Sequence, residues 1–252
     1  MIRTEPLEGH LALVSFQRAE KRNALTRPII DQLHHELRRL AAEPDVRGIV
    51  LAGDGPSFCA GVDLHEFADG TPDSGRLLIQ ALQHLFASVR HHPKPIACAI
   101  QGHCLGGGLE LAACCDVRVS APDAQLGMPE VLLGIPSVID AVMLGHLVGV
   151  GRARELLLTG DSISGETAFA WGLVNRLVPS QDVVPAACEL LVRITRHDPE
   201  VVAAQKKLHQ QWLDLPYETT VEYSVESVVD AFRAGRPQRV AAARLQKSSN
   251  PS

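Results

Sequence analysis

Strand-like and helix-like patterns of apolar residues alternate along the first part of the chain. Residues 10–17 (HLALVSFQ) and 46–53 (VRGIVLAG) are apolar and rich in β-branched side chains, which is typical of strands. Between them, residues 26–45 repeat apolar side chains at helical spacing, with Thr26 as a suitable N-cap. The apolar positions of this helix are Ile30, Leu33, Leu37, Leu40 and Ala41.

The same order of elements recurs farther along. A second helix precedes a break at HHPKP (91–95), and a strand is predicted in IACAIQG (96–102). A glycine-rich helix comes next, and DVRVS (116–120) predicts another strand. Because strands alternate with helices, we expect an α/β fold with a mostly parallel sheet and helices packed against it. The second helix has apolar side chains at Leu77, Leu78, Ala81, Leu82, Leu85, Phe86 and Val89.

Beyond residue 135 the pattern is almost entirely helical. Helices are predicted at about 137–148, 151–158, 164–170 and 181–195. The tail has an Asp-Pro helix start at residue 198 and a helix that ends on Gly235. We therefore divide the chain into an α/β core of residues 1–195 and a C-terminal helical section of residues 196–252. One side of that section is expected to cover an active site or a neighbouring subunit; it carries Val221, Val225, Val228, Val229 and Phe232.

Composition limits the function classes. The 252 residues are 46% hydrophobic and 21% charged, and the formal net charge is -5, so a dedicated nucleic-acid binder is disfavoured. No apolar run is long enough to span a bilayer, and the first residues resemble neither a signal nor a transit peptide. We expect a cytoplasmic protein that does not associate with membranes.

The cysteines and histidines predict no metal site. The six cysteines contain no C-x-x-C pair, and the eleven histidines form no cluster with metal-ligand spacing. No nicotinamide or flavin site is visible, so no cofactor is predicted. Four of the cysteines lie in apolar segments, where cysteine behaves as a small hydrophobic residue and a reducing compartment is expected.

The stretch GHCLGGGLELAACCD (102–116) places three glycines immediately before a glutamate on an apolar helix. Such glycines serve either close packing or a backbone whose N–H groups meet a ligand. A phosphate loop is disfavoured because the G-x-x-x-x-G-K-[ST] pattern is absent. A second segment, GPSFCAGVDLHEF (55–67), has Ala-Gly directly after a predicted strand. Two such loops would supply the paired N–H donors of an oxyanion hole.

Four segments together resemble the crotonase, or enoyl-CoA hydratase/isomerase, superfamily. They are RAEKRNAL (18–25), FCAGVDLHEF (58–67), GHCLGGGLELAACCDVRVSAPDAQLGMPEVLLGIP (102–136) and GRARELLLTGDSISGETAFAWGLVNRLVP (151–179). The resemblance runs in order from about residue 10 to 245. It implies a crotonase-like spiral of ββα units with a helical C-terminal section. It also implies acyl-CoA thioester substrates, stabilisation of a thioester enolate by two backbone N–H groups, and assembly as a homotrimer or a dimer of trimers.

Carried over by position, the resemblance assigns the oxyanion hole to the N–H groups of Val62 and Gly107. Glu110 follows Gly107 by one helical turn, so its carboxylate is expected on the same side of the helix. Glu130, in GMPEVLLG, matches the second catalytic acid of the family's hydratases. Two carboxylates suit addition or removal of water, because one can deprotonate water while the other handles the proton at Cα.

Other positions are implied to bind the CoA part of the substrate. They are Arg22, Ala24, Ala60, Asp63, Leu64, Gly106 and Pro129. The alternative for Arg22 is a solvated arginine. His65 stands where many relatives carry lysine, which puts a phosphate contact there in doubt. Lys206 and Lys207 are either phosphate ligands or, as we prefer, part of a solvated helix face.

The segment after Glu130 departs from the family. Many hydratases read PGAGG there, and a glycine N–H helps to hold the water, whereas this chain reads GIPSVIDAVMLG (134–145). Ser137 or the amide of Val138 is the expected substitute. Asp140 is either a third acid or an exposed residue in the first turn of a helix, and we predict the latter.

Three functions stay open at this point. The favoured one is hydration of a 2-trans-enoyl-CoA to a 3-hydroxyacyl-CoA, or the reverse. Double-bond isomerisation, or another acyl-CoA reaction, needs the same oxyanion hole and as few as one carboxylate. A crotonase-fold protein that only binds CoA, a protein or RNA is the third, and the presence of the glycines and both acids disfavours it.

Overall fold

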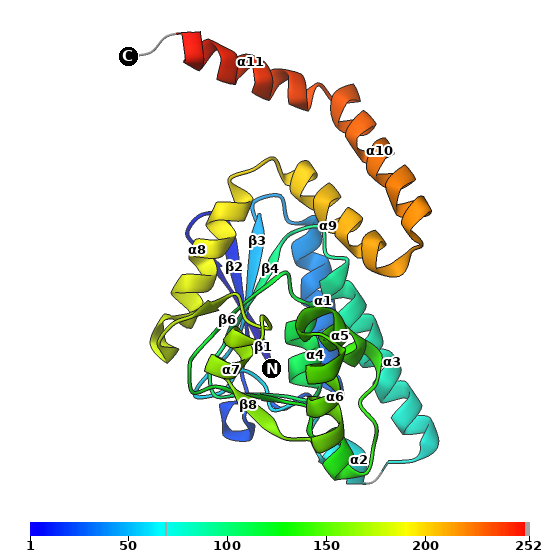
Figure 1. Cartoon of the computed structure of the whole chain (residues 1–252). Coiled ribbons are helices and arrows are strands. Elements are labelled where there is room, and N and C mark those ends of the chain that lie inside the picture. Colours follow the sequence, from blue (N-terminus) through cyan, green and yellow to red (C-terminus); the bar gives the residue numbers. More distant parts are fainter. Residues whose placement is uncertain (69, 250–252) are drawn as a thin grey trace. The chain divides into compact units, whose positions relative to one another are not determined.

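A computed structural model describes residues 1–68 and 70–249, whose helices and strands are drawn in Figure 1. The chain separates into two compact units, one that ends at His197 and one that begins at Asp198. The first unit contains every strand found in the described residues, and the second consists of helices. Across the described residues, no helix combines the length and apolar character needed to cross a membrane.

The larger sheet of the first unit has six strands in the order β1-β2-β3-β4-β6-β9. The strands from β2 onward pair in parallel, which confirms the mostly parallel sheet, while β1 pairs antiparallel with β2. The sequence pattern missed β1, because this edge strand carries charged and half-buried residues. The strands are β1 (Ile2–Leu7), β2 (Leu11–Phe16), β3 (Gly48–Gly53), β4 (Ile96–Ile100), β6 (Val117–Ser120) and β9 (Arg176–Leu177).

A smaller sheet has the order β5-β7-β8, with β5 (His103–Leu105), β7 (Gln125–Gly127) and β8 (Ser162–Ser164). Its strands are three residues long, too short to show a period, so the sequence did not predict them. The pairs β4-β5 and β6-β7 each give one strand to the large sheet and the next to the small sheet. The chain thus winds between the two sheets, and β5 leads directly into the glycine-rich helix.

Four helices build the core around the sheets. Helix α8 packs on β3, β4 and β6, while α1 packs on α3 and α3 packs on α4. Thr26 occupies the predicted N-cap position of α1, and Thr71 caps α3 with a reciprocal capping box. These helices are α1 (Arg27–Ala42), α3 (Pro72–Arg90), α4 (Gly107–Cys114) and α8 (Val183–Thr195).

Further helices complete the first unit. The α-helices are α2 (His65–Ala68), α5 (Val142–Val148), α6 (Val150–Thr159) and α7 (Gly165–Ala170). The 3₁₀ turns are η1 (Ala19–Lys21), η2 (Pro129–Leu133), η3 (Ile139–Ala141) and η4 (Ser180–Asp182). Of these, η2 and η3 follow β7 and become part of the wall of the site.

Helix α4 is buried along its whole length. The buried guanidinium of Arg118 donates to the carbonyls of Ala112 and Cys115 at the helix C-terminus, at 3.1 and 2.7 Å. A cation there also complements the helix dipole. Five of the six cysteines are buried and all six are free thiols, as expected for cysteine used as a small apolar residue. Helix α4 is therefore enclosed in the core, and its C-terminus is bonded to a buried cation.

The second unit contains α9 (Pro199–Asp214), α10 (Tyr217–Arg233) and α11 (Arg236–Ser249). The carboxylate of Asp198 accepts from the N–H groups of Glu200 and Val201, which confirms the predicted Asp-Pro helix start. Gly235 follows α10 with φ +68°, as expected of a glycine that ends a helix. The separate helix α11 was not predicted.

Candidate active site

The three glycines at the start of α4 differ in what they do. Gly106, the N-cap, has φ +51°, and a Cβ there would lie 2.5 Å from Oε1 of Glu130. A Cβ on Gly108 would lie 2.5 Å from the Cys59 carbonyl oxygen, so this glycine serves close packing. A Cβ on Gly107 would meet only ordinary van der Waals contacts, the nearest being 3.6 Å from Val62. Within this one motif, Gly108 therefore serves close packing, and Gly107 leaves room for a ligand.

The first predicted loop lies directly against these glycines. Leu25 donates its N–H to the Gly61 carbonyl at 2.7 Å and accepts from the Asp63 N–H at 2.8 Å. This parallel bridge uses the neighbours of Val62 and directs the Val62 N–H away from Leu25. A Cβ on Gly61 would lie 3.5 Å from the Gly107 nitrogen.

The Gly107 N–H is also left for a ligand. Gly107 lies in the first turn of α4, where an N–H has no carbonyl partner within the helix. Val62 and Gly107 both line one cavity, and among the hydrogen bonds of the described residues neither N–H is used. The positive end of the α4 dipole adds to this pair of donors. The arrangement can bind an oxygen that develops negative charge.

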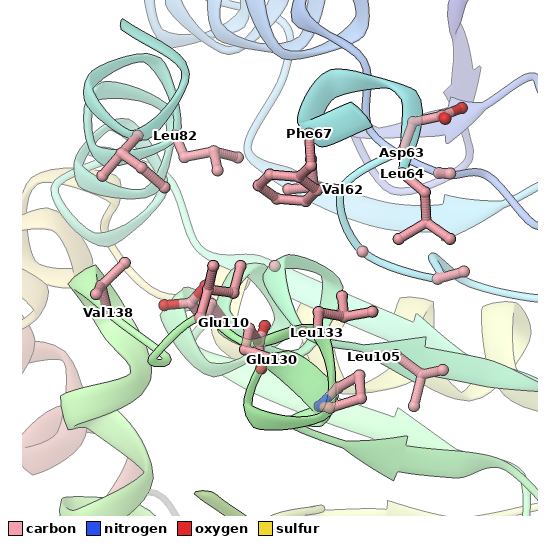
Figure 2. A pocket seen from close by; sticks show the side chains of 18 of the residues that line it. Val62, Asp63, Leu64, Phe67, Leu82, Leu105, Glu110, Glu130, Leu133 and Val138 are labelled. Carbon is pink, nitrogen blue, oxygen red and sulfur yellow. The ribbon is translucent and has the colours of Figure 1, made fainter. Parts of the chain in front are cut away.

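Glu110 projects into the cavity one turn after Gly107 (Figure 2). It is 5% exposed, and its Oε1 accepts the Ala141 N–H at 2.9 Å. Burial, followed by the charge of Glu130, raises the pKa of Glu110 to about 8. A carboxyl that keeps its proton at neutral pH in a cavity is suited to acid–base chemistry.

Glu130 comes from η2 and faces the same cavity (Figure 2). It is half-buried, and its Oε2 accepts the Ser137 hydroxyl at 2.9 Å, while its Oε1 lies against Gly106. Ser137, one of the two expected substitutes for the missing glycine, therefore contacts this acid directly. The cavity brings two carboxyl groups and two backbone donors together.

The cavity has a volume of about 500 Å³ and is largely apolar. Figure 2 shows Phe67 and Val62 across the cavity from the two glutamates. Exposed cationic side chains, Lys21 and Arg22, also belong to its lining. Its apolar lining includes Val62, Leu64, Phe67, Ile79, Leu82, Leu105, Leu132, Leu133, Ile135, Val138 and Ile139. Most of this apolar wall was not assigned to the site from sequence, because its residues follow ordinary helix and loop patterns.

All eleven residues that the resemblance assigns to catalysis or CoA binding line this one cavity. They are Arg22, Ala24, Ala60, Val62, Asp63, Leu64, Gly106, Gly107, Glu110, Pro129 and Glu130. Lys206 and Lys207 belong to the second unit. Among the described residues, no group of three or more histidine, cysteine or acidic side chains is arranged to hold a metal ion.

Asp63 stabilises the first loop through several hydrogen bonds. Its buried carboxylate accepts from the His65 N–H and imidazole, at 3.0 and 2.7 Å, and from Arg18 at 2.5 Å. Hydrogen bonds, first from the His65 N–H, hold the pKa of Asp63 well below its usual range. Arg18 also donates to the Ala24 carbonyl at 3.2 Å. The carboxylate thus braces the segment that presents the Val62 N–H.

The prediction that Asp140 is an exposed residue is wrong. Asp140 is 3% exposed, and its Oδ1 lies 2.9 Å from Nε of Arg90 at the end of α3. A carboxylate is buried in this way when a cation compensates its lost hydration. Its partner is fifty positions earlier in the sequence, so local patterns could not reveal the pair. The only local signal is a lone acid within the apolar run PSVIDAVML.

The model of the family described as enoyl-CoA hydratase/isomerase matches residues 7–238. The chain belongs to this family. Mevalonyl-coenzyme A hydratase sidH of Aspergillus fumigatus is 33% identical over 229 residues, covering 89% of this chain and 83% of the relative. The short-chain-enoyl-CoA hydratase of Clostridium acetobutylicum is 28% identical over 227 residues, covering 89% and 87%.

Solved structures agree with this assignment. The crystal structure of enoyl-CoA hydratase from Bacillus anthracis superimposes with a TM-score of 0.86 at 29% identity, covering 93% of this chain and 96% of that one. This likeness confirms the predicted crotonase-like fold. As a member of the enoyl-CoA hydratase/isomerase family, the chain is assigned to acyl-CoA substrates at the level of the family.

Proposed function

We propose that the protein is an enzyme that adds water to a 2-trans-enoyl-CoA, giving a 3-hydroxyacyl-CoA, or catalyses the reverse dehydration. The observation that carries this proposal is the pair Glu110 and Glu130 in one apolar cavity beside two unused backbone donors. The names of the hydratases among its relatives support the same reaction.

The geometry of the site supports the following sequence of steps. The thioester oxygen accepts the Val62 and Gly107 N–H groups, which stabilise the enolate as it forms. Water bonds to Cβ, one carboxylate takes the proton that this water loses, and the other carboxyl delivers a proton to Cα. For hydration, one of the two glutamates must be protonated before the reaction begins. The raised pKa of Glu110 keeps its carboxyl protonated near neutral pH.

The cavity wall indicates which acyl groups fit. Apolar side chains, including Phe67, Leu82 and Val138, surround the two acids and suit a hydrocarbon acyl chain. Arg22 and Lys21 are the exposed cations of the lining, so we assign the CoA phosphates to that end. No cofactor is required for the reaction, because coenzyme A is part of the substrate.

The deciding experiment compares two substrates. Purified protein is incubated with 2-enoyl-CoA thioesters of increasing chain length, and loss of the conjugated thioester absorbance reports hydration. We expect hydration to exceed conversion of the matching 3-enoyl-CoA. Faster consumption of the 3-enoyl-CoA would replace hydratase by isomerase, and no turnover of either would favour a binding protein.

We also propose that the protein assembles as a homotrimer or a dimer of trimers. Helix α10 exposes Val221, Val225, Val228 and Phe232 in the single chain, and such an apolar row is typical of a contact surface. Light scattering should report a trimer or hexamer at micromolar concentration. A stable monomer would contradict the assembly without affecting the chemistry.

A further inference from the structure

An ion pair between a buried carboxylate and a half-buried guanidinium lies beside the turn that contacts Glu110. Asp140, in η3, and Arg90, in the last turn of α3, are joined by the 2.9 Å contact between Oδ1 and Nε. Among the described residues, those that line the cavity include Val138 and Ile139 but neither member of the pair. Asp140 and Arg90 therefore stand outside the cavity, and Asp140 directly precedes the residue that contacts Glu110.

The turn η3 is held between two helices. It packs on both α3 and α4. Asp140 fastens it to α3, and the next residue, Ala141, donates its N–H to Oε1 of Glu110 on α4 at 2.9 Å. The same N–H lies 3.1 Å from the Val138 carbonyl oxygen, so its direction is set within the turn as well. Because Asp140 and Ala141 are adjacent, a shift of the ion pair shifts the donor.

The backbone of this turn requires such an anchor. Ile139 has φ +52°, the left-handed conformation that β-branched residues rarely adopt. Strained conformations persist at functional sites when surrounding contacts hold them in place. Here the ion pair immediately follows the strained residue, and the contact to Glu110 comes one residue later.

We propose that Arg90 and Asp140 are positioning residues, whose ion pair fixes η3 so that the Ala141 N–H orients Glu110 toward the bound thioester. The proposal rests on the proposed function, in which Glu110 is one of the two acids. It assigns a role to a segment in which this chain departs from the glycine-rich sequence of many hydratases.

Asp140→Asn is the variant of choice for testing the proposal. It removes the charge with little change of shape, and it leaves Arg90, whose side chain is 20% exposed, with access to water. Arg90→Gln is harsher because it leaves a buried carboxylate without its cation. Glu189→Gln is the matched control, since it breaks the pair between Arg176 and Glu189, 3.0 Å apart, which is not part of the cavity lining.

We expect Asp140→Asn to lower kcat by at least about tenfold, because a small displacement of a catalytic group has a large effect on rate. KM should change little, since the groups assigned to CoA are elsewhere. Arg90→Lys should keep more activity than Arg90→Gln, and Glu189→Gln should match the wild type. Equal kcat in Asp140→Asn and wild type, or a loss fully explained by a smaller folded fraction, would overturn the proposal.

Hydrogen exchange at the Ala141 amide gives a readout that does not depend on activity. In the wild type this amide is protected by Glu110 and Val138, and in Asp140→Asn we expect exchange at least about tenfold faster, with amides of α8 unchanged. Unchanged exchange would reject the positioning role. A wild type that hydrates no enoyl-CoA would reject the proposed function, and the exchange comparison would still decide the role of the ion pair.

Discussion

Two turns in the wall of the cavity each contain a residue with positive φ, but one uses glycine and the other isoleucine. Gly106 has φ +51° and Ile139 has φ +52°. At Gly106 a Cβ would lie 2.5 Å from Oε1 of Glu130, so the carboxylate would have to move. At Ile139 the side chain has room, lines the cavity and packs against the core. At Gly106 the backbone, with ψ −126°, and the nearby carboxylate both favour glycine, whereas a positive φ alone does not exclude isoleucine at position 139.

The turns also differ in how they are held. The glycine turn is continuous with a buried helix, and its N–H bonds to the Gly127 carbonyl at 2.9 Å. The isoleucine turn depends on side-chain contacts, namely the pair of Asp140 with Arg90. We therefore expect added side-chain atoms to destabilise the glycine turn. The isoleucine turn should instead be destabilised by the loss of its side-chain contacts.

The largest effect is expected from the two acids. Glu130 lies against Gly106, and Glu110 accepts the N–H of Ala141, close to Ile139. Glu110→Gln and Glu130→Gln should each lower kcat at least about a hundredfold, the low end for lost acid–base catalysis. Because both serve one water and one Cα, the double variant should fall by less than the product. Steady-state kinetics with the best enoyl-CoA measures this. Full additivity, or one silent glutamate, would show that the two do not act as a pair.

A smaller but still large effect is expected at the oxyanion donor. Gly107→Pro removes the N–H at the first helical position, where proline is conformationally acceptable, and should reduce kcat roughly a hundredfold. Gly107→Ala is the matched control, because its Cβ meets only ordinary contacts and the N–H remains. Val62→Ala should likewise keep most activity. Equal activity of the proline and alanine variants would remove Gly107 from the oxyanion hole.

The raised pKa of Glu110 predicts a stability effect. Between its ordinary value of 4.5 and about 8, the folded state binds more protons than the unfolded state. The contribution of this carboxyl is thus fully present below about pH 4.5 and is lost as the pH rises through about 8. Glu110→Gln should be more stable than the wild type at about pH 9, on the order of a few kcal/mol. Urea denaturation across pH tests this.

Two controls sharpen that measurement. Glu189→Gln removes an exposed carboxylate and should keep the wild-type dependence of stability on pH. In the hydration direction, kcat/KM should fall above about pH 8, as the acid pair loses its proton. An identical stability difference at acid and alkaline pH would show that Glu110 does not carry the raised pKa.

The smallest effects test the two turns directly. Gly106→Ala should destabilise the protein by roughly 1–3 kcal/mol, through strain and the clash with Glu130. Ile139→Gly relieves strain but loses packing, so its net effect should be within about 1 kcal/mol. Denaturation midpoints of the two variants measure the difference. A larger loss for Ile139→Gly would reverse the proposed contrast.

Local patterns in the sequence determined the longer helices and strands of the core and pointed to the glycine-rich loops of the site. Helical spacing located α1 and α3, β-branched runs located β2 and β3, and the glycines beside Glu110 indicated the paired donors. These features can be predicted because they are properties of neighbouring residues, fixed by backbone conformation and by the repeat of helix and strand. The family resemblance then assigned the residues that the structure brings to one cavity.

Only the tertiary structure decided what depends on partners far apart in the chain. The three-residue strands of the small sheet exist through pairing across distant segments. Asp140 is buried because Arg90, on another helix, supplies its counter-charge, and Glu110 keeps its proton because the fold removes it from water and brings Glu130 near. Burial and charge proximity arise from packing, so a local pattern of residue types does not encode them.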